Sequence, residues 1–145
     1  MIVLDSSLLV AWTNPRDVHH GAASDFMRRF LDGEWEEGIL LEYVFLEVVT
    51  VIQMRLDHPS AVAMGDQLLR ARELVFVPSS DVFLSAVDIF RTQGALGLSF
   101  ADAAIIAVAR QSAEGRVATF DRGFSRVEGV SVLPEEVRES LAEDA

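Results

Sequence analysis

The sequence predicts one α/β domain with a parallel sheet covered by helices on both faces. Short apolar runs alternate with longer segments of helical periodicity along the chain, which is the pattern of a three-layer α/β/α fold with right-handed crossovers. Most of the apolar runs are continuous, as in strands that are buried on both faces. A chain of 145 residues, half of them hydrophobic, fits a single core, and residues 1–145 contain no linker or repeat.

Five apolar runs are the predicted strands, and each is short enough to cross a sheet once. In chain order they are Ile2–Asp5, Gly38–Leu41, Leu74–Val77, Val117–Phe120 and Val130–Leu133. The segments between them have helical spacing and are bounded by prolines at positions 15, 59 and 78. These predicted helices are Ser7–Thr13, Val18–Leu31, Tyr43–Leu56, Ser60–Arg72, Asp81–Thr92 and Phe100–Ala113. The acidic end, Glu135–Ala145, is expected to fray.

Composition limits the functions that are open to the chain. No apolar run approaches the roughly 20 residues of a membrane span, so we expect a soluble, cytoplasmic protein without a membrane partner. There is no cysteine, and all twelve basic residues are arginines, which excludes thiolate and lysine chemistry. The net charge of -11 argues against a surface that binds nucleic acid all over.

Four acidic residues occupy positions where a solvent-facing charge is not expected. Asp5 and Asp121 end apolar runs, and the carboxyl ends of parallel strands share one edge of a sheet. Glu47 lies about 60° outside the polar arc of its predicted helix, and Asp102 lies on the apolar face of another. Because buried carboxylates are costly unless they bind a cation, the four together predict a Mg²⁺ or Mn²⁺ site for phosphate chemistry.

Each acid also has a structural alternative. Asp5, Ser6 or Ser7 would cap the helix that follows, and Asp121 would stabilise a turn. Asp102 would complete a Ser-x-x-acid capping box with Ser99. Glu47 would be a boundary residue with its stem buried and its carboxylate in water. The three histidines show no metal-ligand spacing, and the first pair is expected to lie at the surface where a helix starts.

These residues, in this order, resemble the PIN-domain nucleases and in particular the VapC-type toxin ribonucleases. The motifs are Ile-Val-Leu-Asp-Ser-Ser at the start, Leu-Glu-Val around Glu47, Leu-Ser-Phe-Ala-Asp-Ala-Ala-Ile around Asp102, and Ala-Thr-Phe-Asp-Arg-Gly-Phe around Asp121. The resemblance spans the whole chain and implies a five-stranded parallel sheet of order 3-2-1-4-5. It assigns catalysis and metal binding to the acids at 5, 47, 102 and 121, with Ser6 and Thr119 as small hydroxyl positions beside the metal.

The function implied is a Mg²⁺- or Mn²⁺-dependent endoribonuclease that prefers single strands, hydrolyses phosphodiester bonds with metal-activated water, and leaves a 5′-phosphate. The toxin branch implies a VapB-like antitoxin as a partner. We also expect a homodimer, because Tyr43–Leu56 and Ser60–Arg72 offer more apolar surface than one sheet face needs. Arg122 and Arg126 would either orient phosphates or be ordinary surface residues.

The same four acids are also compatible with three other classes of protein. Receiver domains and aspartyl-phosphate phosphatases place an aspartate at a strand end, but both require a lysine, which this chain lacks. A PIN-like module that binds a protein without catalysis would need no metal. A PIN nuclease of RNA processing would have the same site without an antitoxin.

Overall fold

The computed structural model describes residues 1–137 and confirms the predicted sheet. Five strands pair in parallel in the order β3-β2-β1-β4-β5. Their bounds are β1 Ile2–Leu4, β2 Gly38–Leu41, β3 Leu74–Val77, β4 Arg116–Ala118 and β5 Ser131–Leu133. Two of the five match the predicted limits at both ends. Strand β1 ends one residue earlier than predicted, β5 begins one residue later, and β4 begins one residue earlier and ends two residues earlier. The part of the predicted frayed end that spans 138–145 lies outside the described residues.

The described helices also lie where the periodicity places them. They are α1 Ser6–Thr13, α2 His20–Leu31, α3 Glu42–Arg55, α4 His58–Arg70, α5 Ser79–Thr92 and α6 Phe100–Ser112. A short 3-10 helix, η1 Arg122–Arg126, directly follows Asp121, for which a turn is one of the expectations from the sequence. None of the described helices is long and apolar enough to cross a membrane.

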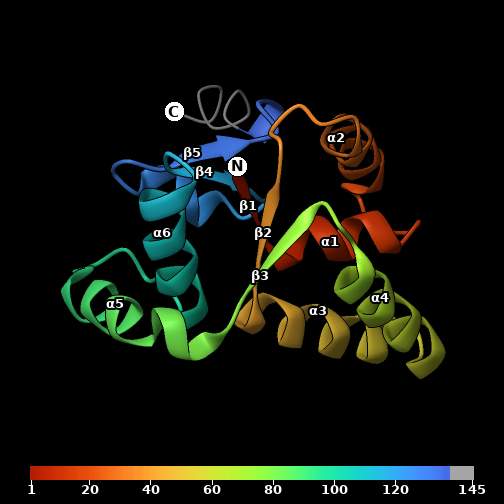
Figure 1. Cartoon of the computed structure of the whole chain (residues 1–145), viewed down its shortest axis with the longest axis horizontal. Coiled ribbons are helices and arrows are strands. Elements are labelled where there is room, and N and C mark those ends of the chain that lie inside the picture. The colour runs from red at the N-terminus through yellow and green to blue at the C-terminus, as the bar shows by residue number, and fades with distance from the viewer. Residues whose placement is uncertain (138–145) are drawn as a thin grey trace.

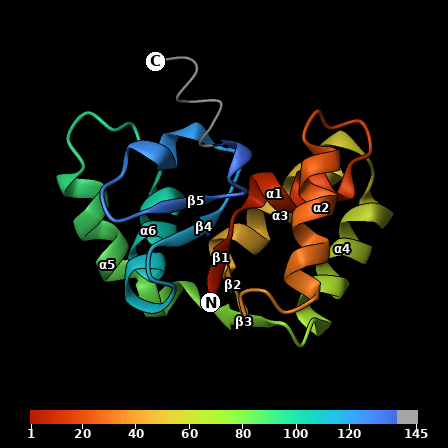
Figure 2. The ribbon, with the colours of Figure 1, turned by 90° about the horizontal axis from the view of Figure 1, so that it is seen from above.

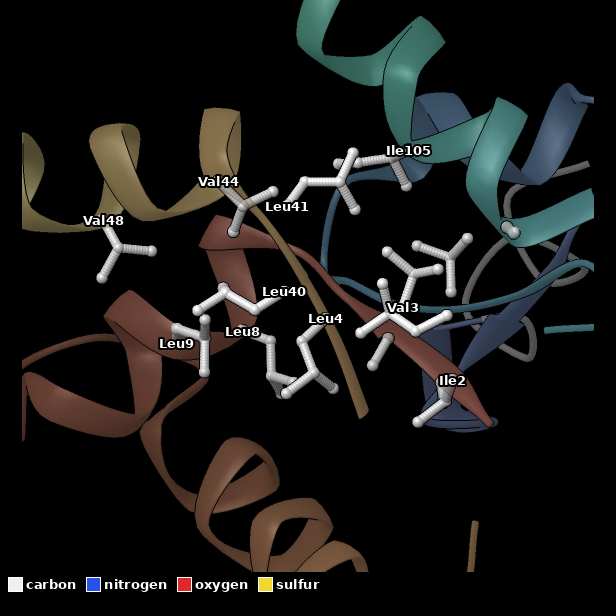
Figure 3. Close-up of a cluster of buried hydrophobic side chains, with 14 of the residues drawn as sticks. Ile2, Val3, Leu4, Leu8, Leu9, Leu40, Leu41, Val44, Val48 and Ile105 are labelled. Carbon is white, nitrogen blue, oxygen red and sulfur yellow. The ribbon is translucent and has the colours of Figure 1, made fainter. Parts of the chain in front are cut away.

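The sheet is sandwiched between two groups of helices. Helices α5 and α6 lie on one side of the strands and α1, α2 and α4 on the other (Figures 1 and 2). Alternate residues of β1 and β2 face opposite groups, so Leu4 and Leu40 lie beside Leu8 of α1, whereas Leu41 approaches Ile105 of α6 (Figure 3). The core therefore fixes the register of β1, whose carboxyl end begins the candidate site.

The edge strand β3 differs from the prediction that the strands are buried on both faces. Val75 and Phe76 in its centre are exposed. Among residues 1–137, β3 pairs only with β2 and is the last strand on its side of the sheet. An apolar run at the edge of a sheet has the same composition as one at its centre, so the sequence did not reveal this exposure.

Two backbone bonds bring the ends of three strands together. The Asp5 N–H donates to the Ala118 carbonyl at 3.0 Å, so the first residue after β1 lies beside the end of β4. The Thr119 N–H in turn donates to the Leu133 carbonyl at 2.9 Å. Asp5 and Thr119 therefore share the carboxyl edge of the sheet, as the strand-end argument predicts.

The turn that leads into β4 requires a glycine at position 115. This residue has a φ of 80°, and a Cβ there would collide with the Gly129 carbonyl oxygen. We expect Gly115→Ala to lower the free energy of unfolding by about 2–4 kcal/mol through left-handed strain and overpacking. Gly94→Ala is the matched control, because Gly94 has a φ of 67° and open space around it. Its loss should be about 1 kcal/mol in urea unfolding. Equal losses would contradict the steric argument.

Candidate active site

The carboxylate of Asp5 is the buried centre of the candidate site. Its residue is only 5% exposed, and two hydroxyl groups donate to the same oxygen, Oδ2. Thr119 Oγ1 donates at 2.7 Å and Ser7 Oγ at 2.9 Å. The Asp5 side chain makes no hydrogen bond that caps α1, although the residue occupies the N-cap position. The capping alternative for Asp5 is therefore wrong, and its oxygens are held by groups from two separate segments.

The two hydroxyls also accept backbone hydrogen bonds from the segment after β4. Phe120 N–H donates to Ser7 Oγ, and Asp121 N–H donates to Thr119 Oγ1, both at 2.9 Å. The network thus links the start of α1 to the end of β4 through side chains. Thr119 lies beside the central acid, as the family resemblance implies.

Ser7 is a site residue that the sequence analysis did not assign. Ser6, which was assigned instead, is buried, but its Oγ lies 3.5 Å from Asp5 Oδ1, at the limit of a hydrogen bond. A hydroxyl two residues after an aspartate is well placed to turn back onto its carboxylate, and this spacing is the signal that was available.

Burial raises the pKa of Asp5 above its ordinary value. The hydrogen bonds from Thr119 and Ser7 oppose this rise in pKa, and the negative charge of Asp102 adds to it. The hydroxyls are neutral, so they stabilise the carboxylate without supplying a counter-charge. A cation bound at the Asp5 carboxylate would supply the positive charge that the hydroxyls do not.

Asp102 caps helix α6 and also lies near two other acids of the candidate site. Its carboxylate accepts the Ser99 N–H at 3.0 Å, while Ser99 Oγ accepts the Asp102 N–H at 3.0 Å, which completes the predicted capping box at the start of α6. The side chain is half-buried, and burial raises its pKa. The Ser99 hydrogen bonds oppose this rise in pKa and the Asp121 charge adds to it. Asp102 thus lies within electrostatic range of both Asp5 and Asp121.

Asp121 and Glu47 are more exposed than the sequence analysis expects. Asp121 accepts the Gly123 N–H at 2.8 Å, so its turn-forming alternative is also realised. Glu47 is exposed, and the prediction that it points away from solvent is wrong. Helix α3 packs on α1 and α4, so the face that carries Glu47 borders a hollow rather than the core.

That hollow, which we call the acidic cavity, lies between α1, α3 and the end of β4. Its volume is about 280 Å³. Its lining residues are Ser6, Ser7, Val10, Asp17, His19, Glu47, Val51, Arg55, Phe120 and Asp121. Ser7 is common to the cavity and to the hydrogen-bond network around Asp5.

The donor chemistry fits a hard divalent cation, although the acids do not form a closed cluster. Among residues 1–137, no three acidic or histidine side chains already lie close enough together to hold a metal ion. The two hydroxyls that contact Asp5 carry no charge. Carboxylate oxygens held in this way suit Mg²⁺ or Mn²⁺.

Comparison with known proteins identifies a family for this arrangement. The model of the PIN domain family matches residues 2–130. No curated protein matches the chain by sequence. Among solved structures, VapC20 of Mycobacterium tuberculosis, a toxin that cleaves the sarcin–ricin loop, is similar with a TM-score of 0.77 and 24% identity. The similarity covers 90% of this chain and 97% of VapC20.

Two further structures share the fold at lower similarity. PAE2754 of Pyrobaculum aerophilum has a TM-score of 0.57 and 19% identity, over 97% of this chain and 89% of its own. FitAcB of Neisseria gonorrhoeae has a TM-score of 0.60 and 18% identity, over 91% of this chain and 96% of its own.

The raised pKa values predict how pH changes the stability of the metal-free protein. Asp5 and Asp102 keep their protons to higher pH when folded than when unfolded, so their contribution to stability falls as pH rises from about 4 through their folded pKa values. In EDTA, Asp5→Asn should therefore be increasingly more stable than the natural protein as pH rises from 4 to 7. Urea unfolding at stepped pH measures this difference.

Asp88→Asn serves as the control because Asp88 is an exposed acid on α5, outside the site. Its difference from the natural protein should not change in this way with pH. A difference for Asp5→Asn that stays constant over the same range would contradict the raised pKa.

Proposed function

The chain belongs to the PIN domain family of nucleases, and on this basis we propose that it is a Mg²⁺- or Mn²⁺-dependent endoribonuclease. We further propose that it acts as the toxin of a toxin–antitoxin pair. The observation that carries the proposal is the buried carboxylate of Asp5, which is oriented by two hydroxyls and lies within electrostatic range of a second, half-buried acid, Asp102.

Each residue of the site has a distinct role in this proposal. Asp5, Glu47, Asp102 and Asp121 would hold the cation, and a bound divalent ion supplies a Lewis acid and acidifies its water. Ser7 and Thr119 fix the Asp5 carboxylate, so its orientation does not depend on a ligand. The Ser99 hydrogen bond likewise fixes Asp102 at the first turn of α6.

The electrostatics favour joint binding of metal and RNA. Without a cation, the acids repel a phosphate backbone, and the net charge of -11 adds no compensating attraction. With a cation bound, this local repulsion is reduced. Arg122 and Arg126 lie on η1, directly after Asp121, and are the arginines proposed to orient phosphates. The similarity to VapC20, a toxin that cleaves the sarcin–ricin loop, supports RNA as the substrate.

An apolar groove supports the proposal of an antitoxin. The groove lies between α2 and α4, has a volume of about 620 Å³, and is lined by Leu9, Trp12, Met27, Phe30 and Leu68 among others. Helix α1 separates it from the acidic cavity, because Leu9 and Trp12 face the groove while Ser7 and Val10 face the cavity. A partner helix in the groove would need only to pass α1 for an arginine on its tail to reach the acids.

Self-association through α3 and α4 stays a prediction. Leu46 and Met54 on α3 and Val62 and Leu69 on α4 are exposed large apolar side chains. Their burial against a second copy would remove this surface from water.

Replacement of Asp102 by Asn tests the nuclease proposal. Loss of a ligand charge should lower kcat/KM on single-stranded RNA at least about 100-fold with Mg²⁺ or Mn²⁺. The Asn oxygen can still accept the Ser99 N–H, so the unfolding midpoint should stay equal or rise as repulsion is relieved. Asp88→Asn is the control and should cleave normally. EDTA should stop the natural protein.

The competing interpretations give different results in the same assays. If Asp102 only caps α6, the variant should keep its cleavage and lose about 0.3–1 kcal/mol of stability, because the Asn side chain keeps the capping hydrogen bond but not the favourable charge at the helix N-terminus. If the chain is a protein-binding module without catalysis, calorimetry should detect no Mn²⁺ binding that depends on Asp5. Cleavage by the purified protein in chelator would disprove the metal mechanism.

Replacement of Ala63 by Arg tests the antitoxin proposal, because Ala63 is an exposed groove residue. The bulky charge should weaken binding of the protein encoded beside this gene at least about tenfold in calorimetry, whereas Ala95→Arg on an exposed loop should not. Binding should slow as salt rises, and excess Mn²⁺ should compete with it. If neither excess Mn²⁺ nor the Ala63→Arg substitution changes the affinity, the partner does not bind through the groove and the acids.

A further inference from the structure

A pair of stacked rings forms part of the wall of the acidic cavity. The rings of His19 and Phe120 lie 4.4 Å apart between centroids with an interplanar angle of 3°. Both residues line the cavity together with Asp121 and Glu47. Phe120 is half-buried and His19 is exposed, so the histidine is the outer layer of the stack.

The His19 ring is not needed for hydrogen bonding within the protein. His20 Nδ1 contacts the Ala11 carbonyl and His58 Nδ1 contacts the Gln53 side chain, each at 2.8 Å. Within the described residues, neither ring nitrogen of His19 has a hydrogen-bond partner, and its one ring contact is Phe120. An exposed imidazole with both nitrogens available can stack on a base and donate to an RNA oxygen.

The stack is held at a fixed place relative to the acids. Phe120 N–H donates to Ser7 Oγ, and the same Ser7 hydroxyl donates to Asp5. On the other side, His19 N–H donates to Asp17 Oδ1 at 2.8 Å, which fixes the backbone at the start of α2. Ser7 Oγ therefore contacts both the backbone of Phe120, whose ring belongs to the stack, and the Asp5 carboxylate, so it holds the two at a fixed separation.

We propose that His19, supported by Phe120, is a platform on which one RNA base stacks next to the phosphate being cleaved. This inference rests on the proposed ribonuclease function and adds a residue that positions the substrate. Single-stranded RNA is recognised by stacking of splayed bases on aromatic or histidine rings, and every base has a π-face. Stacking also supplies affinity that a chain with net charge -11 cannot obtain from its overall charge.

The test compares His19→Ala, His19→Phe and His58→Ala in cleavage of a short single-stranded RNA of mixed sequence with Mg²⁺. Removal of the ring should raise KM about 5- to 30-fold and leave kcat within about twofold. His19→Phe keeps a flat ring, so its KM should stay close to that of the natural protein. His58→Ala removes an exposed imidazole from α4 and should match the natural protein. Thermal unfolding of each variant checks the fold.

Substrates with one abasic nucleotide locate the base that stacks. An abasic site beside the cleaved bond should raise KM for the natural protein. The same substrate should raise KM for His19→Ala much less, because this variant already lacks the platform. Proton NMR of the histidine rings gives a readout that does not require cleavage. Addition of the RNA with Ca²⁺ in place of Mg²⁺ should shift the His19 ring signals upfield and leave those of His58 in place.

The outcomes separate the two proposals. If the natural protein cleaves RNA and His19→Ala has the same KM as His58→Ala, the platform is disproved and the nuclease stands. If the natural protein cleaves no RNA with Mg²⁺ or Mn²⁺, the ribonuclease proposal fails. In that case unshifted His19 signals reject the platform as well, whereas an upfield shift retains it as a base-binding site.

Discussion

The burial of one carboxylate at the end of the first strand determines how the rest of the site is built. A buried charge must be neutralised, solvated by protein groups or bound to a cation. Asp5 meets part of this requirement through Ser7 and Thr119, which lie 112 positions apart in the sequence. Each hydroxyl also accepts a backbone N–H from the segment after β4, so the polar network ties the start of α1 to that strand. The site geometry is thus a consequence of satisfying Asp5.

The hydroxyls that contact Asp5 do not supply positive charge. The negative charges of Asp102 and Asp121 lie close enough to raise the pKa values of neighbouring acids, whereas the ion pairs of Arg29 with Glu34 and of Arg116 with Glu114 lie outside the candidate site. The acidic residues at the carboxyl edge therefore retain a repulsion that lowers stability. Active sites commonly keep such strain because the groups are needed in that state for binding or chemistry.

Sequence patterns predicted the strands well because hydrophobic burial decides where they form. The limits of β2 and β3 were correct, and the strand ends at Asp5 and Asp121 identified the edge of the sheet that carries the site. The solvent exposure of individual side chains was harder to predict from the sequence. Glu47 lies outside the polar arc of its helix and yet is exposed, because its face of the helix borders the acidic cavity. That cavity is formed by the packing of several elements, which helical periodicity does not show.

Residues with two roles also limit what a sequence can show. Asp102 is a capping acid and also lies within electrostatic range of Asp121, so the capping interpretation is confirmed, while its role as a metal ligand stays a prediction. The Ser6 and Ser7 pair illustrates a different limit. Both hydroxyls adjoin Asp5, and backbone direction alone decides that Ser7 makes the shorter contact. The His19 and Phe120 stack joins residues about a hundred positions apart and left no local signal.

The exposed edge strand affects how the protein behaves in concentrated solution. An apolar strand with an open edge is a template for intermolecular β-pairing and hence for aggregation. In this chain β3 is preceded by the charged residues Arg72 and Glu73 and is followed directly by Pro78, which has no N–H to extend the ladder. Such flanking residues act as gatekeepers, and mutual repulsion between molecules of net charge -11 adds to their effect. Colloidal stability is thus maintained by the ends of the strand and by overall charge, while the centre of the strand stays apolar.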